Sequence, residues 1–340
     1  MSPTTDRTTP RQPHPVPSVL PATAVLLDDD VATTLVEAAA AAPSVHNSQP
    51  WQFVVGPRHV DLFADPDRHL RVADGSGRSL LISCGAALLN LRVAADHLGF
   101  HPRVRILPTA DDPTHVARLE VDHRHGWAGH LGDLYPAVWS RRTNRFPFGD
   151  RRIPRSVLAR LHDAVILENA VLRVVEEPAE VARLVSLLHD ADRGDYEEAR
   201  VERARWIGTG SAVDGVPEPA LGPRPADRRT PFRDLGATGA SRPSARFEDA
   251  PTMAVLSTVR DSPADWVRAG QALERALLVA TAEGISASFM NQPLEDHDLR
   301  WQVRSPLTGV GTSQMILRLG YGSPVPATPR RPVSDVLRRA

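Results

Sequence analysis

Hydrophobic positions follow a helical period in some segments of the chain and a strand period in others, and both kinds recur in the two halves. In the first half the pattern predicts helices over 29–42 and 80–98, and strands at 51–55, 59–64 and 115–123. In the second half it predicts helices over 156–165 and 270–284, and strands at 170–175, 252–259 and 314–322. This mixture of helices and strands indicates an α+β protein.

A weak internal repeat relates the two halves. The segments GAALLNLRVAADHLG (85–99) and GQALERALLVATAEG (270–284) agree in register at two glycines, two alanines and one leucine. Small residues on one face of a helix allow a second helix to approach closely. We therefore predict two tandem α+β units, a first unit at 23–140 and a second unit at 141–340.

Two stretches fall outside these patterns. Residues 1–22 are polar and rich in proline, so we expect a disordered N-terminal tail. Residues 214–251 are rich in Pro, Gly and Arg and are too long for a simple connection, so we expect a lid-like insertion in the second unit.

Composition excludes several classes of function. The formal net charge is -1, so the chain has no basic field for a polyanion, and we expect no nucleic-acid partner. All 40 cationic residues are arginines, which excludes a P-loop lysine, a Schiff-base lysine and a pyridoxal phosphate anchor. A bound phosphate would have to be held by arginines, backbone N–H groups or a helix start.

The chain has a single cysteine, and its segments show neither a membrane span nor a signal sequence. Cys84 lies in the apolar helical run, where we expect a buried, inert thiol. No apolar run approaches about 18 residues, and the first twenty residues lack a contiguous apolar region. We predict a cytoplasmic protein with no membrane contact.

Other catalytic patterns are weak. Four histidines, His115, His123, His125 and His130, lie close together in the sequence, but no cysteine accompanies them, and we interpret them as a strand end without a metal. The glycines at 208–215 lack the spacing of a dinucleotide-binding turn, and no nucleophile elbow is present.

Several short motifs occur together in one order. APSVHNSQPWQF (42–53) combines turn residues with the start of a strand, RRTNR (141–145) places three arginines within five positions, and ATPRRPVSDVL (327–337) carries two more. Together with WVRAGQALERALL (266–278) and FMNQPLE (289–295), they resemble the FMN-dependent nitroreductase family. The pattern is most similar to its double-length, dormancy-associated Acg-type branch in actinobacteria. The resemblance covers most of residues 25–340 and implies a nitroreductase-like fold.

The resemblance implies FMN as cofactor and assigns its contacts. Arg141, Arg145 and either Arg330 or Arg331 would hold the phosphate, and such charge-assisted contacts suit a dianion. Ser44 and Asn47 would serve the polar edge of the ring, since an Asn amide offers both a donor and an acceptor. The predicted cofactor-binding residues are Pro43, Ser44, Val45, Asn47, Arg141, Arg142, Thr143, Arg145, Asn291, Gln292, Pro293, Arg330 and Arg331.

The order of the motifs also implies how many flavins are bound. In the family two identical subunits share each FMN site, one giving the phosphate arm and the other the A-P-S-x-x-N turn. Here the turn belongs to the first unit and the arm opens the second, so the chain resembles a fused pseudo-dimer. The converse site would need similar motifs before residue 30 and near 166–171, where the chain reads LPATAVLLDDD and ILENAVL. We therefore predict one FMN per chain and a monomer.

Two functions are compatible with these residues. The first is NAD(P)H-dependent, two-electron reduction of a nitroaromatic or quinone-type acceptor, with no side chain required as acid or base. The alternative is an FMN-sequestering or storage protein in which residues 214–251 cover the flavin, with little or no turnover.

Overall fold

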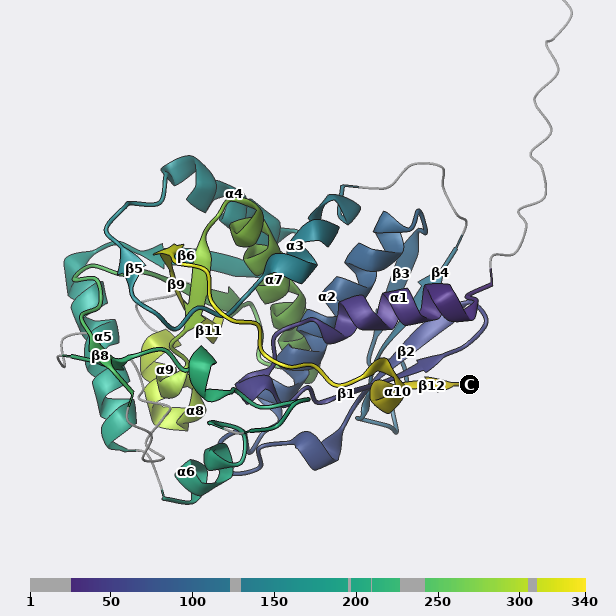
Figure 1. Cartoon of the computed structure of the whole chain (residues 1–340), viewed down its shortest axis with the longest axis horizontal. Coiled ribbons are helices and arrows are strands. Elements are labelled where there is room, and N and C mark those ends of the chain that lie inside the picture. Colours follow the sequence, from purple (N-terminus) through teal and green to yellow (C-terminus); the bar gives the residue numbers. More distant parts are fainter. Residues whose placement is uncertain (1–25, 123–129, 195–196, 209, 227–241, 305–310) are drawn as a thin grey trace, which may run out of the picture.

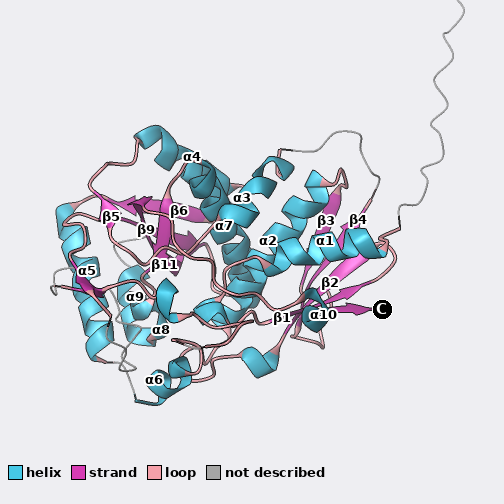
Figure 2. Ribbon diagram, in the orientation of Figure 1, coloured by secondary structure: helices cyan, strands magenta, loops and turns pink. Residues whose placement is uncertain are grey.

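The computed structural model describes residues 26–122, 130–194, 197–208, 210–226, 242–304 and 311–340. The predicted N-terminal tail at 1–22 lies outside these residues. Two sheets flank a central pair of long helices, α2 (Arg78–His97) and α7 (Pro263–Ala282), as Figures 1 and 2 show. The predicted α+β class is confirmed.

The two halves of the chain follow the same path through the same elements. The first half contains α1 (Asp29–Ala40), η1 (Val45–Asn47), β1 (Trp51–Val55), β2 (His59–Ala64), α2, β3 (Pro102–Ile106) and β4 (His115–Val121). The second half contains α4 (Arg155–Ile166), β6 (Val171–Val175), β9 (Thr252–Thr258), α7, β10 (Ser286–Phe289) and β11 (Thr312–Gly322). The sheet orders β1-β2-β4-β3 and β6-β9-β11-β10 correspond strand by strand. The prediction of two tandem units is confirmed, and the exact limits 23–140 and 141–340 stay predictions.

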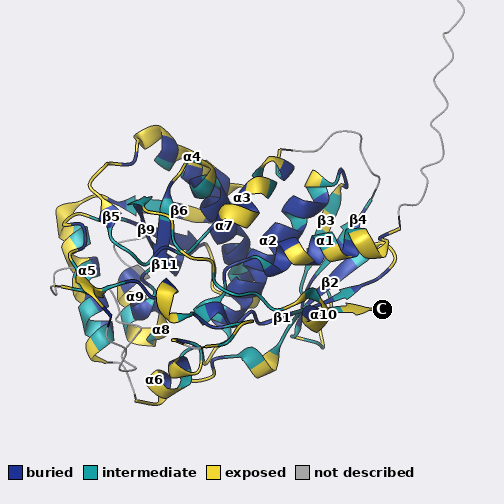
Figure 3. Cartoon of the chain, viewed as in Figure 1, coloured by how far each residue is buried: buried dark blue, intermediate teal, exposed yellow. Residues whose placement is uncertain are grey.

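The repeated glycines mark the point where α2 and α7 cross. A Cβ atom on Gly85 would lie 2.2 Å from the Val267 carbonyl oxygen, and one on Gly270 would lie 2.0 Å from the Ile82 carbonyl oxygen. No side chain fits at such distances, so each glycine is required by close approach of the other helix. Both helices are buried along most of their length (Figure 3). The close helix packing predicted from the repeat is confirmed.

By length and composition α2 is the one helix in the described part of the chain that could cross a membrane. However, 78% of its apolar window is buried inside the protein, which is the position of a core helix.

The C-terminal segment leaves the second unit and ends in the sheet of the first (Figure 1). After α10 (Val333–Val336), β12 (Leu337–Arg339) pairs in parallel with β1, with Leu337 opposite Phe53. Near the start of the second unit, β5 (Phe148–Gly149) forms an antiparallel pair with β11. Because β12 pairs with β1, the C-terminal arm that precedes it runs past the turn between α1 and β1.

A long insertion separates β6 from β9. The first unit joins the corresponding strands, β1 and β2, through residues 56–58 alone, whereas the second uses residues 176–251. The insertion contains α5 (Pro178–Arg193), α6 (Glu197–Ala204), β7 (Arg224–Pro225) and β8 (Ser244–Ala245). It includes the predicted stretch 214–251 and also the residues before it from 176. The sequence does not mark α5 as part of an insertion, because α5 is an amphipathic helix whose pattern does not differ from that of a core element. The remaining helices are α3 (Tyr135–Ser140), α8 (Gln292–Glu295) and α9 (His297–Arg304).

Candidate functional site

A cavity of about 340 Å³ lies between the two units. Its walls come from the turn after α1, the start of α2, the segment after α3, the segment from β10 into α8, the insertion and the C-terminal arm. This volume falls within the range of about 300–1,000 Å³ that is usual for small-molecule sites. All predicted cofactor-binding residues except Pro293 and Arg331 line the cavity.

The turn that joins α1 to β1 forms one wall and has an unusual backbone. His46, Asn47 and Gln49 have φ values of 46°, 56° and 50°, a region that costs a non-glycine residue of order 1–3 kcal/mol. Two hydroxyl groups hold this shape: Ser44 Oγ accepts from the Gln49 N–H at 2.9 Å, and Ser83 Oγ on α2 accepts from a backbone N–H of η1 at 3.1 Å. Such strain is typical of a pre-organised site.

The Asn47 side chain binds the protein itself. Its Nδ2 donates to the carbonyl oxygens of Gly215 (2.8 Å) and Pro329 (3.0 Å), and its Oδ1 accepts from Arg330 at 3.0 Å. Both amide hydrogens are thereby used, so Asn47 cannot offer the donor that we expected at the ring edge. Instead it ties the turn to the insertion and to the C-terminal arm.

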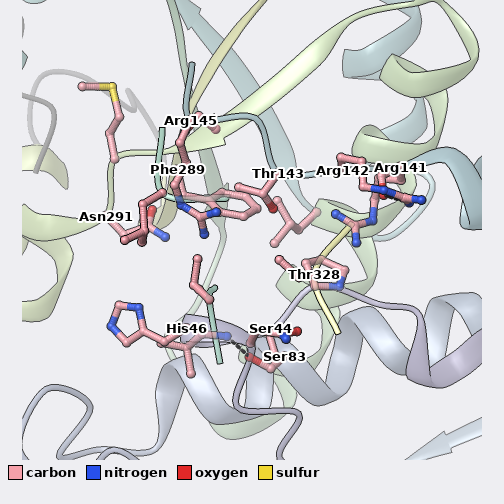
Figure 4. A pocket seen from close by; sticks show the side chains of 18 of the residues that line it. Ser44, His46, Ser83, Arg141, Arg142, Thr143, Arg145, Phe289, Asn291 and Thr328 are labelled. Carbon is pink, nitrogen blue, oxygen red and sulfur yellow. Dashed lines mark hydrogen bonds between the residues drawn. The ribbon is translucent and has the colours of Figure 1, made fainter. Parts of the chain in front are cut away.

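Three arginines from two distant segments meet at one end of the cavity. Arg141 and Arg142 follow α3 and lie side by side in Figure 4, and Arg330 comes from the arm. Arg141 and Arg330 both donate to the carbonyl oxygen of Ala41, at 3.2 and 3.0 Å. Burial and the positive charge of Arg141 lower the pKa of Arg330 to about 9, and the same two causes lower the pKa of Arg142. We call Arg141, Arg142 and Arg330 the arginine end.

A single buried acid lies next to the arginine end. Glu274 of α7 is fully buried, and its Oε1 is 3.4 Å from Arg141 Nε. Burial raises the pKa of Glu274 to about 7, although the charges of Arg141 and Arg330 oppose this rise. No local pattern predicts this burial, because an acid in an amphipathic helix normally faces solvent.

Arg145 lies along the cavity wall, apart from the arginine end and next to Phe289 (Figure 4). It donates to the Ala220 carbonyl oxygen at 3.2 Å, and burial lowers its pKa to about 10. A Cβ on Gly222 would lie 2.4 Å from the Arg145 carbonyl oxygen, so the insertion approaches this residue closely. The structure thus separates Arg145 from the arginines with which we had grouped it.

The opposite end of the cavity contains the FMNQPLE segment. Asn291 Oδ1 accepts from the Ile316 N–H at 2.8 Å, which fixes the start of α8 against β11. Gln292 also lines the cavity, and Pro293 does not. Of the two alternatives in the arm, Arg330 lines the cavity, whereas Arg331 turns toward the backbone oxygens of Gln49 and Trp51.

The insertion forms the roof of the cavity. Its lining residues are Val216, Leu221, Pro223, Pro225, Arg242 and Phe247. Contacts fix it to the first unit, since Arg68 forms an ion pair with Asp214 at 3.0 Å and Gln49 Nε2 donates to the Val213 carbonyl oxygen at 2.8 Å. At its other end, buried Glu248 pairs with fully buried Arg318 of β11. Four residues of the predicted lid that could contact a flavin by stacking or by charge, Arg228, Arg229, Phe232 and Arg233, lie outside the described residues.

Sequence reasoning missed several residues that line the cavity. Ser83 is one of few polar residues in the apolar run of α2, and Thr328 adjoins the predicted arginines, so a signal existed for both. Phe289 also lines the wall, and it opens the FMNQPLE segment, of which only residues 291–293 were predicted to bind the cofactor.

The turn of the second unit that corresponds to the turn between α1 and β1 is organised differently. Between α4 and β6 the turn spans residues 167–170, whereas the turn between α1 and β1 spans 41–50. In the short turn the buried carboxylate of Glu168 bonds to Arg92 and Arg275, each at 2.6 Å. An acid therefore occupies a place that corresponds to the wall of the cavity.

Comparison with known proteins gives the following relatives. A Mycobacterium tuberculosis protein named "Putative NAD(P)H nitroreductase Rv3131" is 32% identical over 319 residues, covering 91% of this chain and 92% of its own. The M. tuberculosis protein named "Putative NAD(P)H nitroreductase acg" is 30% identical over 322 residues, covering 92% of this chain and 96% of its own. No protein-family model matches the chain.

Solved structures were compared as well. The FMN-dependent nitroreductase NfnB from Mycobacterium smegmatis, in complex with NADPH, aligns with a TM-score of 0.40 and 20% identity over 61% of this chain and 98% of its own. A nitroreductase structure from Anabaena variabilis, also described as putative, aligns with a TM-score of 0.47 and 12% identity over 83% of this chain and 82% of its own.

Proposed function

The chain belongs to the nitroreductase family of its mycobacterial relatives, and from that premise we propose that it binds one FMN in the cavity between its units. Bound FMN would supply two-electron chemistry between NAD(P)H and a small acceptor such as a nitroaromatic or a quinone. The residues of this chain would bind and orient the cofactor and exclude water. No acid or base is required of a side chain, so we assign no catalytic residue.

The observation that carries the proposal is the arginine end. Arg141, Arg142 and Arg330 are held together despite their mutual repulsion, and the structure records one buried acid, Glu274, beside them. A phosphate dianion would supply the missing negative charge through charge-assisted hydrogen bonds. Arg330 Nε is buried without a partner among the described residues, so the cluster retains donor capacity.

The rest of the cavity suits a flat aromatic ring. Its apolar lining includes Val45, Leu273, Phe289 and Met315. Ser44 and Asn291 line the cavity from different elements and are labelled in Figure 4, and their polar groups could meet the edge of the ring. An apolar pocket with a few polar groups is the usual design of a cofactor site.

The asymmetry of the two halves supports the proposal of one flavin per chain. The turn at 167–170 is too short to repeat the wall formed by 41–50, and its buried Glu168 already pairs with the guanidinium groups of Arg92 and Arg275. Because both contributors to the remaining site are in one chain, we propose that a monomer is sufficient. We also propose a cytoplasmic location, which accords with the single buried thiol of Cys84.

A second candidate function is storage of FMN without turnover. The observation that favours it is the roof, which hydrogen bonds fix to the turn and a buried ion pair fixes to β11. A fixed roof over the ring would exclude both nicotinamide and acceptor, so the insertion would act as a permanent lid.

Anaerobic mixing of the flavin-loaded protein with NADPH, and separately with NADH, distinguishes the two functions. Rapid loss of the visible flavin band supports the reductase. Persistence of the band, together with rapid bleaching of free FMN by dithionite as a control, supports storage. A protein that takes up no FMN from solution contradicts both.

A further inference from the structure

A charged group to which the proposed function gives no role lies directly behind the wall of the cavity. Glu274 is fully buried on α7, does not line the cavity, and lies beneath the arginine end with Oε1 3.4 Å from Arg141 Nε. A buried carboxylate with an imperfect partner costs stability, because desolvation is offset only in part. Its pseudo-equivalent in α2, by the register of the repeat, is the apolar Leu89.

The surroundings of Glu274 are short of hydrogen bonds. Neither of its carboxylate oxygens accepts a hydrogen bond of ordinary geometry from the described residues, and Arg141 Nε donates none, although the two groups form an ion pair. The Asn90 side chain of α2 lies beside the carboxylate and opposes the rise in the pKa of Glu274, while the two polar atoms of its amide have no hydrogen bond of ordinary geometry among the described residues. A proton on Glu274 would add a donor to this group and remove a buried charge. The burial that raises the pKa of this acid to about 7 acts in the same direction.

The charged groups that face Glu274 come from two elements besides its own. Arg141 and its neighbour Arg142 follow α3, and Arg330 lies on the C-terminal arm. When the cavity holds no anion, an ionised Glu274 is the acid that offsets these cations. When a dianion binds to the same guanidinium groups, Glu274 experiences a nearby like charge, which disfavours its ionised form.

We propose that Glu274 is a proton-binding site coupled to the arginine end, taking up a proton from solvent when a phosphate dianion binds to Arg141, Arg142 and Arg330. The proposal rests on the proposed function for the identity of the ligand, FMN, but its chemistry is that of any phosphate monoester. The proton adds to a carboxylate oxygen, no other bond forms or breaks, and no co-reactant is required. As a consequence, the protein retains FMN more tightly as pH falls through neutrality.

The test is titration calorimetry of the protein with FMN near pH 7.5 in two buffers of different ionisation enthalpy, which counts the protons taken up. The parent is expected to take up a fraction of a proton, at most about one per FMN. Glu274→Gln keeps the size of the side chain but cannot titrate, so it is expected to take up none. The second ionisation of the phosphate, with a pKa near 6, contributes equally to both proteins and cancels in the difference.

Two further arms separate this inference from the proposed function. Riboflavin lacks the phosphate and should bind without proton uptake in either protein. Inorganic phosphate tests the arginine end alone. If the protein takes up protons when phosphate binds but does not bind FMN, the proposed function is contradicted and the coupling is intact. Equal proton counts for the parent and Glu274→Gln would overturn the coupling, as would the failure of both FMN and phosphate to bind. If the variant does not fold, the coupling requires the parent to gain a protonated-carboxyl band in its infrared difference spectrum on binding, and absence of the band refutes it.

Discussion

Replacing Glu274 by Gln should change how the stability of the FMN-free protein depends on pH. The pKa of Glu274 is raised from 4.5 to about 7 in the folded protein, chiefly by burial. A folded-state pKa above the unfolded value means that the folded protein holds the proton more tightly. The stability associated with this group is therefore fully present below about pH 4.5 and is lost as pH rises through about 7.

The magnitude follows from the size of the shift. A difference of about 2.5 pKa units at about 1.4 kcal/mol per unit corresponds to roughly 3 kcal/mol. Between about pH 4.5 and pH 8, the free energy of unfolding of the parent should fall by roughly this amount relative to Glu274→Gln. Urea unfolding of both proteins, followed by tryptophan fluorescence across that range, measures the difference.

Other acids with shifted pKa values do not affect the comparison. Burial raises the pKa of Asp74. Burial also acts to raise the pKa of Asp261, but hydrogen bonds and the charge of Arg300 together outweigh it and lower this pKa to about 2. Both are present in parent and variant, so their contributions cancel in the difference. Parallel pH profiles for the two proteins, within about 1 kcal/mol, would refute the account of Glu274 as a strained buried acid.

Three other changes test other parts of the structure. Arg141→Ala should weaken FMN binding by about 2–3 kcal/mol, since one charged partner of the dianion is lost, whereas riboflavin affinity should be unchanged; an equal loss for riboflavin would mean that Arg141 acts structurally. Gly85→Ala places a Cβ 2.2 Å from a carbonyl oxygen of α7 and should lower the free energy of unfolding, measured by urea titration, by about 3 kcal/mol or more. The control Gly194→Ala, whose Cβ meets only ordinary contacts at 3.5 Å, should change that free energy little. Equal effects of the two substitutions would contradict the tight crossing of α2 and α7. Deleting residues 218–246 and joining the ends with a short Gly and Ser linker should speed stopped-flow reduction by NAD(P)H at least about tenfold, or about 1.4 kcal/mol of barrier, and an unchanged rate with normal FMN binding would mean that the insertion is not a lid.

Local patterns were sufficient to predict much of the fold. The repeat around Gly85 and Gly270 predicted the close helix pair, because close packing leaves a direct trace in residue size. The turn at 42–50 and the arginines at 141 and 142 were identified through their resemblance to motifs of the nitroreductase family. In each case the information lies in a short segment of sequence.

What the sequence could not supply depends on contacts between distant segments. The Asn47 amide is used by carbonyl oxygens of Gly215 and Pro329, which no local pattern could indicate. The choice between Arg330 and Arg331 depends on the path of the C-terminal arm, which the pairing of β12 with β1 determines. Glu274 appears as an ordinary helical acid until α2 and the arginine end enclose it.

The central claim is that the chain forms one flavin site, with the phosphate at the arginine end. Native mass spectrometry of the protein after saturation with FMN and removal of free ligand tests it most directly, by counting the flavins on each chain. We expect a single species that carries one FMN per chain. A species with two FMN per chain would contradict the asymmetry between the two turns, and a species with none would contradict the site itself.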